Sequence, residues 1–203
     1  MEINITSDSL QLPAAVESRR AGVVSTIFAM TVFGSAFLLF LVQPLLGKYI
    51  LPWFGGSPSV WTTCMLIFQA LLFFGYAYAH LLARLPLRWQ ATLHIGMLLA
   101  AVLTLPITPA SSWKPTEISE PSTQIILLVL ACVGLPYFLL SATGPLLQSW
   151  FARTQPGVSP YRLYALSNIG SLLALVAYPF MIERWLAKPD QTVAWSCAFA
   201  LFA

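Results

Sequence analysis

Charged side chains are so sparse along this chain that they divide it into long, mostly apolar stretches. The charge-free runs cover residues 21–47, 49–83, 89–113, 121–152, 163–182 and 191–203. A helix needs about 20 mainly apolar residues to cross a bilayer, and the first five runs reach that length. The sixth would cover only about 20 Å at ~1.5 Å per residue. We therefore expect a last helix that is truncated, in a chain that is a piece of a longer one.

The pattern predicts an all-α integral membrane protein with six transmembrane helices. The expected helices span roughly residues 23–47, 58–83, 89–107, 124–150, 160–182 and 191–203. Ser57 suits the N-cap of the second helix and Pro58 its first residue, where a missing N–H costs nothing. Ser159 and Pro160 suit the same positions in the fifth helix. Two internal prolines, Pro136 and Pro145, predict a kink in the fourth helix.

A motif that occurs twice divides the chain into two units. The sequence Phe-Leu-Leu followed by Pro-Leu-Leu occupies residues 37–46 and again 138–147, an offset of 101 positions, and Ser-Pro at 57 returns at 159. A fixed period defines a structural unit. Residues 21–107 then hold helices 1 to 3 and residues 124–203 hold helices 4 to 6, with 108–123 as the loop between them. Because three crossings is an odd number, the second repeat must be inverted relative to the first, as in many transporter folds.

Composition supports the membrane class and removes several functions. Hydrophobic residues make up 58% of the chain and charged residues 8%, whereas soluble domains carry roughly a quarter charged residues. No Asp, Glu, Lys or Arg falls in the middle of an expected helix, and no glycine-rich nucleotide-binding turn is present. The basic residues are scattered, which gives no case for nucleic acid. We expect no enzyme activity, no metal and no cofactor.

The Lys and Arg residues set the expected orientation. Six lie in the first 20 residues, the second loop and the fourth loop, namely Arg19, Arg20, Arg84, Arg88, Arg153 and Arg162. Four lie on the opposite side, namely Lys48, Lys114, Arg184 and Lys188. Cytoplasmic loops carry the excess of basic residues. The polar tail, residues 1–20, is therefore predicted to be cytoplasmic.

Polar side chains within the apolar runs are the candidate site residues. Such groups are costly to expose to lipid, so they should point inward: Gln43, Gln69, Gln148, Ser167, Asn168 and Ser171. They either line a cavity near the repeat interface or form hydrogen bonds between helices, with small residues allowing close approach. The sequence leaves both interpretations open.

Two histidines offer a further candidate. His80 near the end of the second helix and His94 near the start of the third lie toward the same side of the membrane and could ligate a haem or chlorophyll as a pair. The alternative is that each is satisfied by water or a backbone carbonyl near the membrane surface. Free cysteines Cys64, Cys132 and Cys197 have no partner at metal-ligand spacing.

Two stretches of the chain resemble a known family. They cover Ser35–Phe40, Val42–Leu45, Gly47–Lys48, Leu51–Pro58 and Val60–Cys64 in the first half, and Phe138–Thr143, Pro145–Gln148 and Ser159–Asn168 in the second. In these motifs the chain resembles the membrane portion of the bacterial fused MFS/spermidine-synthase-like proteins, over about residues 22–203. The resemblance implies half of an MFS-like fold in the bacterial inner membrane. Family members continue into a soluble synthase-like domain, and no residue here matches its catalytic positions.

Three functions fit these observations. The first is a non-enzymatic membrane module that packs with a missing C-terminal domain or with other membrane subunits. The second is an accessory transmembrane subunit of a larger, for example energy-transducing, complex. The third is a transporter of a small solute or polyamine, built as a dimer of six-helix units. A polyamine path should contain buried carboxylates, whereas all seven acidic residues lie in the tail or loops. Aromatic residues, at 13%, could hold cations instead.

Overall fold

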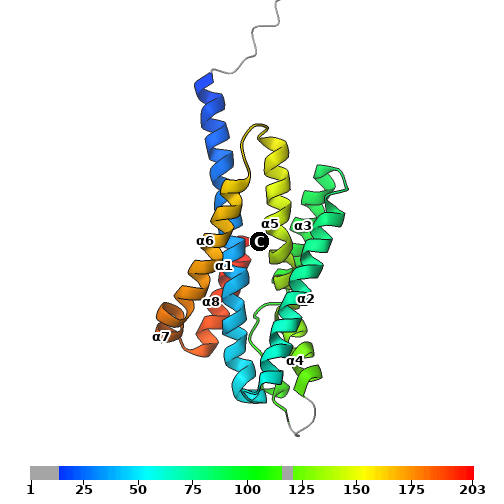
Figure 1. Cartoon of the computed structure of the whole chain (residues 1–203), viewed down its shortest axis with the longest axis vertical. Helices are drawn as coiled ribbons and strands as arrows, with labels where there is room; N and C mark the ends of the chain where they lie inside the picture. Colours follow the sequence, from blue (N-terminus) through cyan, green and yellow to red (C-terminus); the bar gives the residue numbers. More distant parts are fainter. Residues whose placement is uncertain (1–13, 116–120) are drawn as a thin grey trace, which may run out of the picture.

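The protein is a bundle of six helical rods (Figure 1). The computed structural model describes residues 14–115 and 121–203. The first three rods are α1 (Ala14–Phe54), α2 (Pro58–Leu82) and α3 (Leu87–Val102). The fourth runs from α4 (Pro121–Val129) through a π-helical turn, η2 (Leu130–Gly134), into α5 (Leu135–Thr154). The fifth runs from α6 (Tyr161–Ala177) through a second π-helical turn, η3 (Tyr178–Ile182), into α7 (Glu183–Trp185), and α8 (Lys188–Phe202) is the sixth. The all-α prediction is confirmed.

Four rods are long and apolar enough to cross a membrane, which supports a multi-pass membrane protein in contact with lipid. They are Ala21–Phe54, Pro58–Leu82, Pro121–Thr154 and Tyr161–Trp185. The other two, α3 and α8, are 16 and 15 residues long. Helix α3 ends at Val102 rather than near residue 107, because Pro106 and Pro109 follow and cannot donate to a helical ladder. A single 3₁₀ turn, η1 (Ser111–Trp113), lies in the loop after it.

Helix α1 is much longer than predicted. It begins at Ala14, inside the expected tail, and runs through Pro44 and Pro52 to Phe54, although the sequence placed a loop from Lys48 onward. Residues 1–13 of the predicted tail lie outside the described residues. The helix ends where Gly55 takes a φ of +87°, a left-handed conformation that glycine adopts without steric cost.

Local signals placed the start of α2 correctly and that of α6 one residue early. Ser57 is the N-cap of α2, and its hydroxyl accepts from the Val60 backbone N–H. At α6 the N-cap is Pro160, so the helix begins at Tyr161. The Ser159 hydroxyl still accepts from the Tyr161 N–H at 3.3 Å.

The two π-helical turns lie beside prolines. Pro136 is the second residue after η2, and Pro179 lies within η3. A proline inside a helix lacks an N–H and its ring clashes with the carbonyl of the preceding turn. A local π-helical turn relieves that clash. Pro145, by contrast, is accommodated within regular α-helix.

Helix α1 and the α4–α5 rod form the centre of the bundle. Helix α6 packs along α1, α2 packs along α4 and α5, α3 packs on α5, and α8 packs on α1. The chain direction of α4–α5 opposes that of α1 (Figure 1). The fully buried core side chains between them include Leu45, Leu46, Ile125, Leu128, Leu139, Trp195 and Phe199.

Glycines allow the two closest helix contacts. A Cβ atom on Gly75 of α2 would lie 1.7 Å from Ser141 Oγ and 2.8 Å from the Phe138 carbonyl oxygen. A Cβ on Gly170 of α6 would lie 2.9 Å from the Phe33 carbonyl oxygen. Small residues at such crossings let membrane helices approach to backbone contact.

Hydrogen bonds recur in the two halves at the same spacing of 101 residues as the sequence motif. Gln90 Nε2 donates to the Leu85 carbonyl at 2.6 Å, and Gln191 Nε2 donates to the Leu186 carbonyl at 2.8 Å. Each glutamine thus anchors the chain turn before its own helix.

A second pair of contacts follows the same spacing. Trp195 Nε1 on α8 donates to the Leu38 carbonyl of α1 at 2.9 Å. On α3, His94 is bonded to the Thr143 hydroxyl, which donates to the Leu139 carbonyl of α5. His94 lies 101 positions before Trp195, and Leu139 lies 101 positions after Leu38. The outer helices of both halves are therefore tied to the central rods at matching positions.

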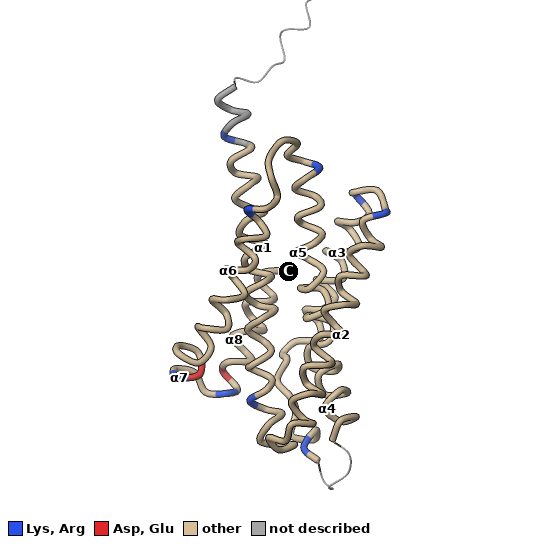
Figure 2. Tube along the Cα trace, in the orientation of Figure 1, with Lys and Arg blue, Asp and Glu red and all other residues tan. Residues whose placement is uncertain are grey.

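Charged side chains gather at the two ends of the bundle (Figure 2). The salt bridge found among the described residues joins Lys48 at the end of α1 to Glu183 at the start of α7. This arrangement leaves an uncharged middle zone, as a bilayer requires. Which end faces the cytoplasm stays a prediction from the Lys and Arg distribution.

Candidate polar cavity within the helix bundle

A polar cavity of about 400 Å³ lies between α1, α2, α5 and α6. We call it the Asn168 cavity. Its polar lining comes from all four helices and consists of Ser35, Tyr76, Ser141, Gln148, Tyr164, Ser167, Asn168 and Ser171. Four of these residues, on the fourth and fifth rods, are among the candidates from sequence: Gln148, Ser167, Asn168 and Ser171.

Two side-chain amides are among the free hydrogen-bonding groups of this cavity. The Ser141 hydroxyl donates to the Phe138 carbonyl at 2.7 Å, and the Ser171 hydroxyl donates to the Ser167 carbonyl at 3.0 Å. Hydroxyls bonded to their own helix in this way keep only acceptor capacity. Within the described residues, the amides of Gln148 and Asn168 have no protein partner. They can offer both donors and acceptors to a guest molecule.

The remaining two candidates lie in a different cavity. Gln43 and Gln69 line a space of about 230 Å³ further along α1, together with Trp61, Cys64, Phe68 and Leu175. We call it the Gln43 cavity. Since Pro44, Gly47 and Leu51 of α1 line this space and Ser35 to Phe40 line the other, the two cavities follow each other along the same helix.

Gln43, in the lining of the Gln43 cavity, is bonded to a buried tyrosine of α5. Gln43 Nε2 donates to the Tyr137 hydroxyl at 2.9 Å, and the Tyr137 side chain is 1% exposed. The Tyr137 ring packs on Phe68 with ring centroids 5.1 Å apart. A hydrogen bond from α1 to α5 and an aromatic pair from α5 to α2 therefore join these three helices beside the Gln43 cavity.

Replacing Tyr137 by Phe tests the hydrogen bond between Gln43 and Tyr137. The change removes the hydroxyl that accepts from Gln43 and leaves a half-buried amide unpaired, which should lower stability by about 1–3 kcal/mol. Thermal unfolding in detergent measures the effect. Tyr164→Phe is the matched control, because the Tyr164 side chain is 58% exposed and should change stability by less than about 0.5 kcal/mol. Equal effects of the two variants would contradict the assignment.

Neither cavity has a charged residue in its lining. The available groups are amides, hydroxyls and aromatic rings, which recognise uncharged polar molecules by hydrogen bonds and stacking.

The histidines lie in separate surroundings. His80 is exposed on α2, with Nε2 3.3 Å from an Arg84 guanidinium nitrogen. His94 is buried on α3, where its Nε2 lies 3.0 Å from Thr143 Oγ1. Because the Thr143 hydroxyl donates to Leu139, its oxygen accepts from His94 Nε2–H, and Nδ1 is left without a partner. Across the described residues, no group of three or more His, Cys, Asp or Glu could hold a metal ion.

Sequence reasoning missed four hydroxyl groups in the lining of the Asn168 cavity. Ser35, Ser141, Tyr76 and Tyr164 are part of its lining. Serine and tyrosine are common in membrane helices without a site role, because helix carbonyls satisfy their hydroxyls. The signal that could have found Ser35 and Ser141 is their position beside the repeated Phe-Leu-Leu motif, at residues 37–39 and 138–140.

Comparison with known proteins finds no match for this chain among family models, curated proteins or solved structures.

Proposed function

We propose that this protein is a non-enzymatic integral-membrane module whose polar face pairs with a second membrane unit. The observation that carries the proposal is the exposure of polar side chains at the cavities. Asn168 and Gln69 are exposed, and Tyr76 is 51% exposed, on segments long and apolar enough to cross a bilayer. An amide facing hydrocarbon loses its hydrogen bonds at a cost of several kcal/mol. A protein surface or water must therefore cover this face.

The proposed architecture is two inverted three-helix repeats, equivalent to half of an MFS-like fold. An exchange of rods 1, 2 and 3 with rods 4, 5 and 6 leaves the packing scheme unchanged. The contact of α1 with α6 then corresponds to the contact of α5 with α2, and the contact of α1 with α8 corresponds to the contact of α5 with α3. The hydrogen bonds of Gln90 and Gln191, and of His94 and Trp195, support the same exchange. The Asn168 cavity lies between rods 1, 2, 4 and 5, where inverted-repeat transporters bind their substrates.

The resemblance to the membrane portion of fused MFS/spermidine-synthase-like proteins is part of this proposal and rests on the sequence motifs. The resemblance implies the bacterial inner membrane, and the distribution of Lys and Arg supports a cytoplasmic N-terminal end. The partner is then either a C-terminal domain of the same polypeptide or another membrane subunit. An accessory subunit of a larger membrane complex presents the same polar face to a different protein.

Transport of a small solute is a second candidate, favoured by the two cavities that follow each other along α1. Their lining lacks carboxylates, although a polycation would need them. An uncharged polar solute is therefore a better fit than a polyamine. In this case the second unit is a second six-helix copy that completes the path.

Purification in mild detergent followed by intact and native mass measurement tests the pairing. We expect a complex of about twice 22.3 kDa, or a stoichiometric complex with another membrane polypeptide. A much larger intact mass with synthase-like peptides would identify the partner as a fused domain. A stable monomer of this mass, with no bound polypeptide, would contradict the proposal.

A further inference from the structure

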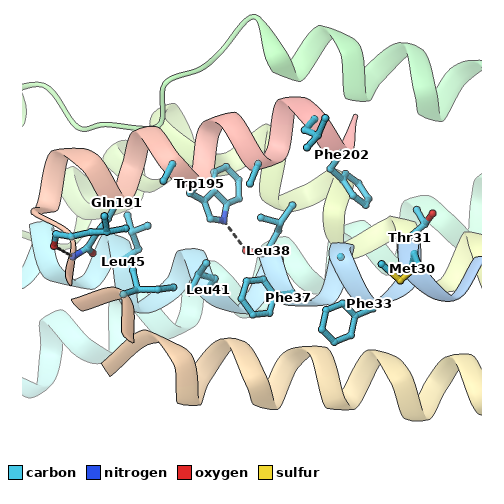
Figure 3. A pocket seen from close by; sticks show the side chains of 16 residues that line it. Met30, Thr31, Phe33, Phe37, Leu38, Leu41, Leu45, Gln191, Trp195 and Phe202 are labelled. Atoms are coloured by element: carbon cyan, nitrogen blue, oxygen red, sulfur yellow. Dashed lines mark hydrogen bonds between the residues drawn. The ribbon is translucent and has the colours of Figure 1, made fainter. Parts of the chain in front are cut away.

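An apolar groove of about 610 Å³ lies on the other side of α1, between α1, the η3–α7 segment and α8 (Figure 3). Its walls include Phe33, Phe37, Leu41, Trp195 and Phe202. The labelled polar side chains lie at its two ends, Gln191 at one and Thr31 at the other (Figure 3).

The equivalent space in the first half is filled by the protein itself. The Tyr78 ring packs on Phe138 and His94, with centroid distances of 5.2 and 6.0 Å. The residues at the 101-residue spacing from these two are Phe37 and Trp195, and both line the open groove. Phe37 stacks with Phe33, and Trp195 stacks with Phe199. In the first half the Tyr78 ring fills the space beside Phe138 and His94, whereas in the second half the space beside Phe37 and Trp195 is the open groove.

The dimensions of the groove match a single hydrocarbon chain. Along α1 it extends from Met30 to Leu45, about 22 Å at ~1.5 Å per residue. Its lining is almost wholly apolar and the groove is open to its surroundings, so an extended acyl chain can lie along it. The groove borders two candidate membrane spans, where lipid is the surrounding solvent.

Basic side chains lie at the Gln191 end. The segment that links η3 to α8 carries Arg184 and Lys188, both exposed. The salt bridge of this region joins Lys48 to Glu183, and Asp190 lies in the first turn of α8, where a carboxylate is stabilised by the helix dipole. Arg and Lys at the membrane surface attract lipid phosphate.

From these observations we propose that the groove is a phospholipid site. One acyl chain lies along α1 against Phe37 and Trp195, and the headgroup phosphate lies at Arg184 and Lys188. This site is separate from the Asn168 cavity and does not depend on the proposed function.

Native mass spectrometry of the delipidated protein, titrated with palmitoyl-oleoyl-phosphatidylglycerol in detergent, tests the site. Ala198→Phe places a ring in the groove, and Ala200→Phe makes the same change on α8 at a position outside the lining. We expect one tightly bound lipid in the wild type and in Ala200→Phe, and at least tenfold weaker binding in Ala198→Phe. Equal binding by the two variants, or a co-purified polypeptide in the groove, would overturn the proposal.

The headgroup contact is tested without altering the groove. The double variant Arg184→Gln, Lys188→Gln changes two exposed side chains, and Arg88→Gln is a control at another exposed turn. The double variant should bind phosphatidylglycerol at least fivefold more weakly and bind palmitoyl-oleoyl-glycerol, which lacks the phosphate, as the wild type does. Equal wild-type affinity for the two lipids would overturn the phosphate assignment. If Ala198→Phe does not fold, the comparison of the two lipids still tests the phospholipid site.

Discussion

Replacing Gly75 by Ala should destabilise the bundle by about 1–3 kcal/mol, the usual cost of forcing an extra methyl group into a packed interface. The added Cβ would lie 1.7 Å from Ser141 Oγ and 2.8 Å from the Phe138 carbonyl oxygen. The serine hydroxyl can rotate, but the carbonyl belongs to the backbone of α5, so α2 and α5 must separate. Thermal unfolding in detergent, followed by circular dichroism, measures the loss.

Gly96→Ala is the matched control for this change. Gly96 lies within α3, and no atom approaches within 4 Å of a Cβ built there. Alanine is favoured over glycine inside a helix by about 0.5–1 kcal/mol, so this variant should be slightly more stable than the wild type. If both alanine variants shift stability in the same direction, the close contact between α2 and α5 is wrong.

Replacing Asn168 by Leu should weaken the binding of an uncharged polar solute in the Asn168 cavity about tenfold. The change removes an amide without a protein partner and substitutes a side chain of similar size that cannot hydrogen-bond. A lost hydrogen bond of about 1.4 kcal/mol weakens binding about tenfold. Thermal-shift measurements with a panel of neutral polar solutes detect binding, because a ligand at 100 times its Kd stabilises by about 2.7 kcal/mol.

Asn168→Gln is the control that retains the amide. It should keep part of the stabilisation that the Leu variant loses. If the cavity only serves helix packing, Asn168→Leu will change the unfolding temperature without changing any solute effect. A solute that stabilises the wild type and the Leu variant equally would exclude Asn168 from the binding site.

Local rules predicted the start of α2 and failed where distant contacts decide. Ser57 was recognisable as an N-cap because the cap needs only the next three residues. The extension of α1 beyond Gly47 was not predictable, because Lys48 finds its partner in Glu183, 135 residues later. A lysine read as the start of a loop is instead a helical residue held by an ion pair.

The same contrast between local and distant information holds for the candidate site residues. Polar residues were singled out by their cost in an apolar environment, but which of them share a cavity depends on their position along the bundle axis. Gln148, Ser167, Asn168 and Ser171 line one cavity, whereas Gln43 and Gln69 line another. The role of Gln43 depends on Tyr137, whose ring and hydroxyl gave no signal in the sequence.

The central claim is that the face around Asn168 is a polar site that water reaches, rather than a surface covered by lipid. Labelling of single cysteines in native membranes tests it most directly, in a background with Cys64, Cys132 and Cys197 replaced by Ser. A water-soluble maleimide reacts with the thiolate, which does not form in hydrocarbon. We predict that Asn168→Cys is labelled at least tenfold faster than Leu173→Cys, which lies on α6, is 46% exposed and is outside the cavity lining. Equally slow labelling at both positions would contradict a water-accessible site.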